Sequence, residues 1–126
     1  MYEIDLSHVV RLGPRRVRIQ LPVTLSTGEV IDIAWSNELT DELMWVDTTE
    51  TYRVGQNVEV AFVDDEERTW TLKAQVSRLA VRQGVCLSFH DLDRDQRLGL
   101  VVFIARTVAK AETADHDLAG VAVARV

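Results

Sequence analysis

The alternation of apolar and polar residues is the feature that most constrains how this chain can fold. It is strict in the segment 16–25, where every second residue is apolar: Val17, Ile19, Leu21, Val23 and Leu25. A period of two residues is typical of a strand that has one face in a core and the other in solvent. Five further short runs follow, at 30–35, 43–46, 58–62, 70–76 and 85–89. Six short strands separated by turn residues predict a mainly β fold, an antiparallel barrel or sandwich.

The periodicity changes after residue 90. Apolar residues then recur at helical spacing, at Leu98, Val101, Val102, Ala105 and Val108. Asp91, Asp93 and Asp95 precede them, and we expect these carboxylates to cap the start of one helix and to favour its positive dipole end. The segment 120–126 fits either a frayed tail or a late strand added to a sheet edge, and the sequence leaves both alternatives open.

Length and composition predict one soluble domain. The chain has 126 residues, of which 47% are hydrophobic, enough for one core without metals or disulfides. Its net charge of −6 argues against non-specific nucleic-acid binding, which requires a basic surface. We expect a cytoplasmic protein without membrane insertion, because the sequence shows neither an apolar run near the roughly 20 residues of a membrane span nor a secretory signal. The lone Cys86, between apolar neighbours, is predicted to be a buried, inert thiol.

The sequence offers little support for catalysis or for a cofactor. His8, His90 and His116 are scattered and lack the spacing of a metal site, so neither a metal nor a cofactor is predicted. The acidic cluster 64–67 is predicted to be a solvated hairpin tip, where nothing would raise a pKa toward the range of a general acid. We therefore expect a protein that is not an enzyme.

Positive charge is concentrated in one short segment of this acidic chain. The segment contains four arginines: Arg11, Arg15, Arg16 and Arg18. Guanidinium groups can hold phosphates or purine edges through paired hydrogen bonds. Alternatively, arginines at a strand edge discourage pairing with neighbouring molecules and bind the domain's own carboxylates.

The tryptophans are predicted to belong to the core. Trp35, Trp45 and Trp70 lie in phase with core-facing positions or within an apolar run. Burial is therefore their expected role, in preference to the base stacking of an RNA-binding barrel.

The order of these elements resembles the PilZ domain family. The segments 16–23, 54–62 and 84–92 are similar to the first strand, the central strand and the last strand of that family. The resemblance covers roughly residues 11–106, judged by element order. It implies a six-stranded antiparallel PilZ-like β-barrel with one C-terminal α-helix. The expected boundaries are an N-terminal extension at 1–10, the barrel and helix at 11–112, and a tail at 113–126.

PilZ domains usually bind cyclic di-GMP through two motifs. The first is Arg-x-x-x-Arg, and Arg11-Leu-Gly-Pro-Arg15 has that spacing. However, Arg16 is the arginine directly before the strand, and the partner position counted from it is Leu12. The arginine motif is thus present, with an ambiguous register.

The second motif, Asp/Asn-x-Ser-x-x-Gly, precedes the third strand of the family and is altered here. Placing 44–46 on that strand puts Glu38, Thr40 and Leu43 at its three defining positions. A leucine opposes both the positive φ and the close ligand approach that glycine permits. Asp41 and Glu42 add carboxylates beside the phosphate position, where like charges repel.

These observations favour a regulatory adaptor that acts through protein–protein contacts and does not bind cyclic di-GMP. By resemblance, its partners would be motility or signalling components, and its role would lie in bacterial motility, polarity or surface behaviour. Candidate partner-binding residues are Arg15, Arg16 and Trp45. The alternative hypothesis is a cyclic di-GMP receptor, whose binding residues would be Arg11, Arg15, Arg16, Arg18, Glu38 and Thr40.

Overall fold

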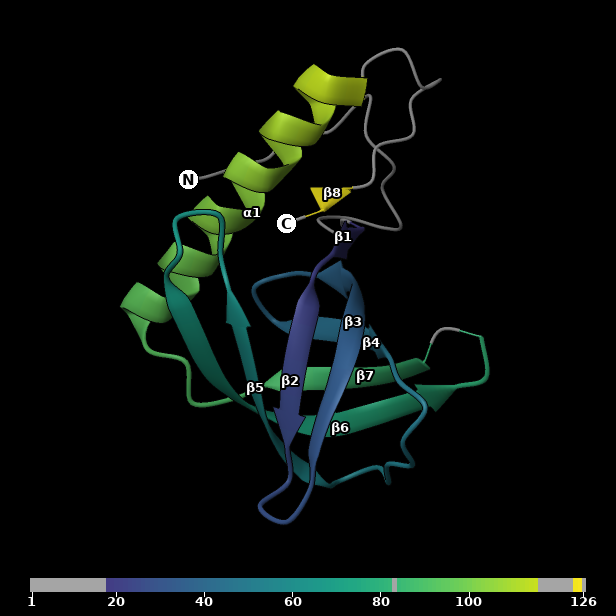
Figure 1. Ribbon diagram of the computed structural model, residues 1–126. Helices are drawn as coiled ribbons and strands as arrows, with labels where there is room; N and C mark the ends of the chain where they lie inside the picture. The colour runs from purple at the N-terminus through teal and green to yellow at the C-terminus, as the bar shows by residue number, and fades with distance from the viewer. Residues whose placement is uncertain (1–17, 83, 116–123, 126) are drawn as a thin grey trace.

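Six strands form a closed barrel, and one long helix packs against it (Figure 1). The computed structural model describes residues 18–82, 84–115 and 124–125. The elements are β1 (Ile19–Gln20), β2 (Pro22–Ser26), β3 (Ile31–Leu39), β4 (Leu43–Asp47), β5 (Asn57–Val63), β6 (Thr69–Ala80), β7 (Gly84–Phe89), α1 (Arg94–Asp115) and β8 (Ala124–Arg125). The barrel order is β2-β3-β4-β7-β6-β5, with antiparallel neighbours throughout. The predicted six-stranded antiparallel barrel with a C-terminal helix is confirmed.

The first predicted strand is divided at Leu21 into β1 and β2. The Ser36 hydroxyl occupies this division: it accepts a hydrogen bond from the Leu21 N–H at 3.0 Å and donates one to the Ile19 carbonyl. β1 leaves the barrel and pairs in parallel with β8. Of the two alternatives for the segment 120–126, a frayed tail or a late strand, Ala124–Arg125 therefore forms the late strand.

The core fills the barrel and continues beneath α1. Along β1 and β2 the predicted alternation is confirmed, because Ile19, Leu21, Val23 and Leu25 are all buried. Cys86 is buried as predicted. Among the described residues, no helix is long and apolar enough to span a membrane.

Strand β3 has the opposite arrangement from the one its sequence indicates. Ile31, Ile33 and Trp35 are 71%, 78% and 54% exposed, whereas the residues between them, Asp32, Ala34 and Ser36, are buried. The expected burial of Trp35 is therefore wrong, while that of Trp45 and Trp70 is confirmed.

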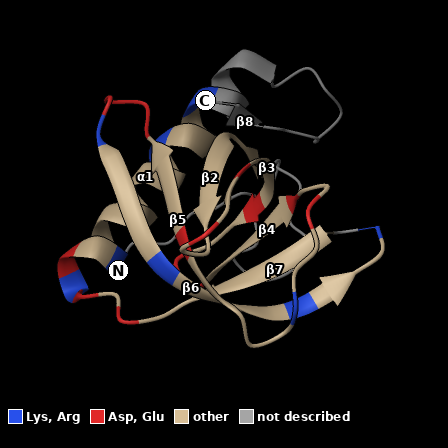
Figure 2. Cartoon of the chain, turned by 60° about the horizontal axis from the view of Figure 1, so that its bottom comes forward, with Lys and Arg blue, Asp and Glu red and all other residues tan. Residues whose placement is uncertain are grey.

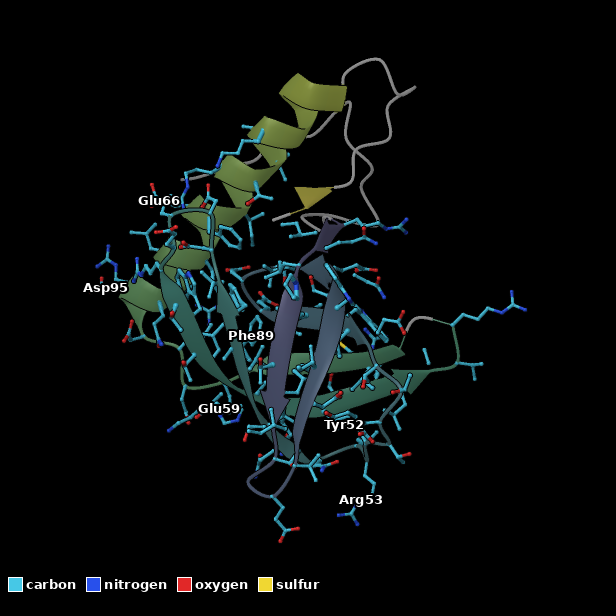
Figure 3. The ribbon with its side chains drawn as sticks, in the orientation of Figure 1. Tyr52, Arg53, Glu59, Glu66, Phe89 and Asp95 are labelled. Carbon is cyan, nitrogen blue, oxygen red and sulfur yellow. The ribbon has the colours of Figure 1, made fainter. Side chains whose placement is uncertain are left out.

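Polar partners inside the barrel explain this reversal. The Asp32 carboxylate accepts hydrogen bonds from the Thr48 hydroxyl at 2.5 Å and from the buried Tyr52 hydroxyl at 2.8 Å. Figure 3 places Tyr52 near the lower end of β3. Burial and the hydrogen bond to Asp32 raise the pKa of Tyr52 well above its usual value. Since Asp32 and Ser36 both have inward hydrogen-bond partners, the pleat turns the apolar residues between them outward.

Helix α1 begins with a capping box. The Asp93 carboxylate accepts the Gln96 N–H at 2.7 Å, and the Gln96 side chain accepts the Asp93 N–H at 3.1 Å. The predicted capping role is thus confirmed for Asp93. The helix extends to Asp115, past the predicted boundary at 112. It approaches the barrel closely at Gly99, where a Cβ atom would lie 2.7 Å from the Trp70 ring.

The acidic turn between β5 and β6, red in Figure 2, lies against α1. Asp65 binds Arg106 at 2.8 Å and Lys110 at 2.6 Å, and these bonds hold its pKa well below the usual value. Asp64 is only 5% exposed. The prediction of a solvated tip is therefore wrong for Asp64, because a helix distant in sequence covers it.

Candidate functional site

The structure describes only part of the predicted arginine motif. Arg11, Arg15 and Arg16 lie outside the described residues, whereas Arg18 is described, directly precedes β1 and is exposed. Because Ser36 of β3 hydrogen-bonds on both sides of the β1–β2 division, the chain enters the barrel beside the end of β3. The second predicted motif begins at this same end of β3, at Glu38.

The second motif forms a tight turn between β3 and β4. The Thr40 hydroxyl accepts the backbone N–H groups of Glu42 and Leu43, each at 3.0 Å. The Thr40 N–H donates in turn to the Leu43 carbonyl at 2.9 Å. A hydroxyl has two acceptor lone pairs, so the turn itself uses the acceptor capacity of Thr40. This side chain, which is also buried, stabilises its own loop.

Leu43 has an ordinary strand conformation at the position where the family motif has glycine. It is the first residue of β4 and pairs with Ser88 of β7. Among the described residues other than glycine, positive φ values occur at Glu67 and Asp91 only. The backbone here thus lacks the conformation for which a glycine is required.

Glu38 and Trp45 lie directly opposite each other on β3 and β4. A bulge between Ser36 and Glu38 shifts the register of β3 at this point. Trp45 lies between two residues of the core cluster, Met44 and Val46, so its own side chain is on the outer side of the wall. Nevertheless Glu38 and Trp45 are only 6% and 3% exposed. The structure thus brings a predicted ligand residue and a predicted partner residue together, and little of either is accessible.

Two arginines from other elements complete this region. The guanidinium of Arg78 on β6 lies over the Trp45 ring, 5.6 Å from its centroid. Arg97 of α1 contacts the turn through the carbonyl of Asp41 at 3.2 Å and through its carboxylate at 3.4 Å. The β3–β4 turn is thereby attached to the helix.

A second surface, which the sequence did not indicate, covers the outside of β3, β2 and β5. We define the outer apolar face as Pro22, Ile31, Ile33, Trp35, Ala61 and Val63. Strand register places Trp35 opposite Pro22, and Ile33 and Ala61 on either side of Thr24. A shallow groove of about 510 Å³ runs between β3 and β5 over this face. The sequence signal for this face was the alternation within β3. Asp32 and Ser36 alternate with the apolar residues, so only one of the two sets can face the core.

The described residues contain no cluster of His, Cys, Asp and Glu side chains suited to a metal ion. They do contain paired carboxylates at the β5–β6 turn, but Asp64 and Asp65 both have lowered pKa values. Burial raises the pKa of Asp64, but hydrogen bonds from Trp70 and from the backbone of Arg68 and Glu66 outweigh that effect. A lowered pKa is unsuited to a general acid at neutral pH.

Comparison with solved structures identifies the fold. A PilZ domain of CeSA from a cellulose-synthesizing bacterium matches with a TM-score of 0.59 and 16% identity, over 75% of this chain and 97% of the other. The inhibitor of motility MotI/DgrA from Bacillus subtilis matches with a TM-score of 0.63 and 15% identity, over 80% of this chain. This chain covers 53% of the length of MotI/DgrA, about half. No protein-family model matches the sequence, and a comparison with curated proteins gives no significant match. The barrel and its C-terminal helix therefore have the fold of a PilZ domain.

Proposed function

We propose that this chain is a PilZ-like regulatory adaptor that works through protein–protein contacts and does not bind cyclic di-GMP. Its partners would be motility or signalling components in the bacterial cytoplasm, with a role in motility, polarity or surface behaviour. The solved structures with a similar fold include one described as an inhibitor of motility, which supports this general area. The proposal includes neither catalysis, nor a cofactor, nor nucleic-acid binding.

The conformation of the β3–β4 turn carries this proposal. Both acceptor positions of the Thr40 hydroxyl are used by the turn, and Leu43 begins a strand where a ligand loop would need glycine. Arg97 binds Asp41 and keeps this turn against α1. A nucleotide phosphate arriving here would meet the carboxylates of Asp41 and Glu42, and like charges repel. The second ligand motif has thus become part of the scaffold.

Isothermal titration with cyclic di-GMP tests the proposal. The full chain is expected to show no heat of binding. Binding in the low micromolar range that disappears in the variant Arg15→Ala/Arg16→Ala would contradict it and establish the receptor alternative. Arg82→Ala, at an exposed position in the β6–β7 turn, is the matched control for loss of positive charge.

A rebuilt motif provides the complementary test. The variant Glu38→Asp/Thr40→Ser/Leu43→Gly restores the family pattern at all three defining positions. If the altered turn is what prevents binding, this variant should acquire affinity that the unmodified chain lacks. Equal affinity of the two proteins for the nucleotide would show that the turn is not the determinant.

The arginine segment remains our candidate for partner capture, because it is the local exception to a net charge of −6. Replacement of Arg15 and Arg16 by alanine should leave the fold intact and abolish capture of the native partner in a pull-down from the host. Unaltered capture would count against this segment.

A further inference from the structure

The outer apolar face gathers exposed apolar side chains from three neighbouring strands around the polar Thr24. Ile31, Ile33 and Trp35 follow one another along the outer side of β3. Across β2, the exposed Val63 and the half-buried Ala61 continue the face on β5. Figure 1 shows these three strands side by side. Contiguous exposed apolar patches of this kind mark interaction surfaces, whereas single exposed apolar residues need no explanation.

The barrel itself does not require apolar residues at these positions. The fold uses the inward side of β3, where Asp32 and Ser36 make their hydrogen bonds and Ala34 is buried. On β2, the outward neighbours of Ile33 and Ile31 are the polar residues Thr24 and Ser26, so the outer side of this wall accepts polar side chains. An exposed tryptophan and two isoleucines on the same strand are therefore unexplained by folding.

Acidic side chains border this face. Asp47 is exposed and is the register partner of Trp35 on β4. Glu29 is exposed in the turn that leads into β3. Glu59 is exposed two strands from Ile31, at the lower end of β5 in Figure 3. Among the described residues that strand register places along this border, Lys73, opposite Glu59, is basic. The three acidic residues and Lys73 together carry a net negative charge.

The negative charge of these border residues distinguishes between two possible binding partners of the face, a second copy of this chain and a basic protein segment. In a two-fold dimer of this chain, the same patch meets itself, so acidic borders would approach acidic borders. A partner with basic residues around an apolar centre would instead match both the centre and the border. We propose that the outer apolar face docks a protein segment of this chemistry: apolar side chains flanked by lysine or arginine. This inference rests on the proposed function as a protein-binding adaptor and specifies the chemistry of its partner.

A library of random peptides displayed on phage is the probe that tests this inference. It is panned on the full chain and, in parallel, on the variants Trp35→Ser and Ile33→Ser. The peptides enriched on the unmodified chain should contain apolar residues flanked by lysine or arginine. A synthetic copy of an enriched peptide should bind at least about tenfold more weakly to Trp35→Ser, as expected for the loss of an aromatic hot spot.

Three controls make the result specific. Val81→Ser removes a fully exposed apolar residue at the β6–β7 turn, outside this face, and should leave peptide binding unchanged. Asp47→Lys reverses the charge beside Trp35 and should weaken binding of the basic peptide. Binding to the unmodified chain should also weaken as salt rises from ~0.01 M to ~1 M, because the screening length falls from ~30 Å to ~3 Å. Circular dichroism checks that each variant is folded.

Several outcomes would overturn this inference. These are an absence of enriched peptides, enrichment of peptides with neutral or acidic flanks, and binding that Trp35→Ser does not change. A dimer of the unmodified chain in sedimentation velocity that dissociates in Trp35→Ser would assign the face to a second copy. Peptides that bind Trp35→Ser but not Arg15→Ala/Arg16→Ala would refute this face and leave the adaptor function standing. Failure of the adaptor function appears separately, as cyclic di-GMP binding in the titration.

Discussion

Replacing Asp64 by asparagine tests how the β5–β6 turn is stabilised. The Asp64 carboxylate is buried and uses both oxygens. Oδ1 accepts the backbone N–H groups of Glu66 at 2.8 Å and of Arg68 at 2.9 Å, and Oδ2 accepts the Trp70 indole N–H at 3.0 Å. An asparagine is nearly identical in shape, but one oxygen becomes an amino group that can only donate.

The expected loss of stability follows from this geometry. The amide oxygen must face the two backbone donors, so the amino group is directed at the indole N–H and two donors face each other. Hydrogen bonds to a charged group contribute about 1.5–3 kcal/mol, and a buried unsatisfied donor costs about 1–3 kcal/mol. Two bonds weakened by the loss of charge and one replaced by a repulsive contact lead us to expect a destabilisation of ~2–5 kcal/mol.

Urea denaturation followed by tryptophan fluorescence measures this loss directly. The matched control is Glu66→Gln, which makes the same chemical change at an exposed carboxylate in the same turn. It should alter the free energy of unfolding by less than ~0.5 kcal/mol. If Asp64→Asn were equally mild, the hydrogen bonds of the Asp64 carboxylate would not be what stabilises this turn.

Three further predictions concern other parts of the scaffold. Gly84→Ala should lower the free energy of unfolding by more than ~2 kcal/mol in thermal melts, because φ is +92° and the new Cβ would lie 2.0 Å from the Val46 carbonyl oxygen. An unchanged melting temperature would contradict this. The two basic partners of Asp65 on α1 hold its pKa below the unfolded value of ~3.9. The stabilisation of the folded state by these ion pairs is complete above the unfolded pKa of Asp65 and is lost as pH falls through its folded pKa. The stability of Asp65→Asn should therefore fall less steeply below about pH 4 than that of the unmodified chain, and parallel curves from urea melts would refute the ion pairs as the cause. Tyr52→Phe should cost ~1–3 kcal/mol in urea melts, because buried Asp32 loses a donor at 2.8 Å; a neutral result would show that Thr48 alone satisfies the carboxylate.

The sequence predicts those strands in which polarity and burial agree. In β2, Val23 and Leu25 are both apolar and buried, so a period of two was sufficient. In β3 the period was visible, but its phase depended on where Tyr52 and Thr48 place their hydroxyls, which is tertiary information. Shifting the phase of a strand by one residue exchanges its two faces completely.

The acidic turn shows the same limit for charge. A run of carboxylates at a hairpin tip is ordinarily solvated, and no local signal distinguishes Asp64 from its neighbours. Its burial depends on Trp70 across the turn and on helix α1, which supplies Arg106 from forty-two positions away. At the altered ligand motif, by contrast, the leucine at position 43 already indicated an ordinary backbone, and β4 begins there.

Closure of the barrel has a consequence for how any partner can be recognised. Each of the strands β2 to β7 has a hydrogen-bonded neighbour on both sides, so no strand of the barrel offers a whole free edge to an incoming chain. The seam between β2 and β5 is paired at 24–26 and 59–61, which leaves few backbone groups for binding by strand addition, the mode that draws its affinity from main-chain hydrogen bonds and tolerates many sequences. A partner of the barrel must therefore be recognised mainly through contacts with side chains. Its affinity should then depend on individual residues, and single substitutions on either protein should be enough to separate the pair.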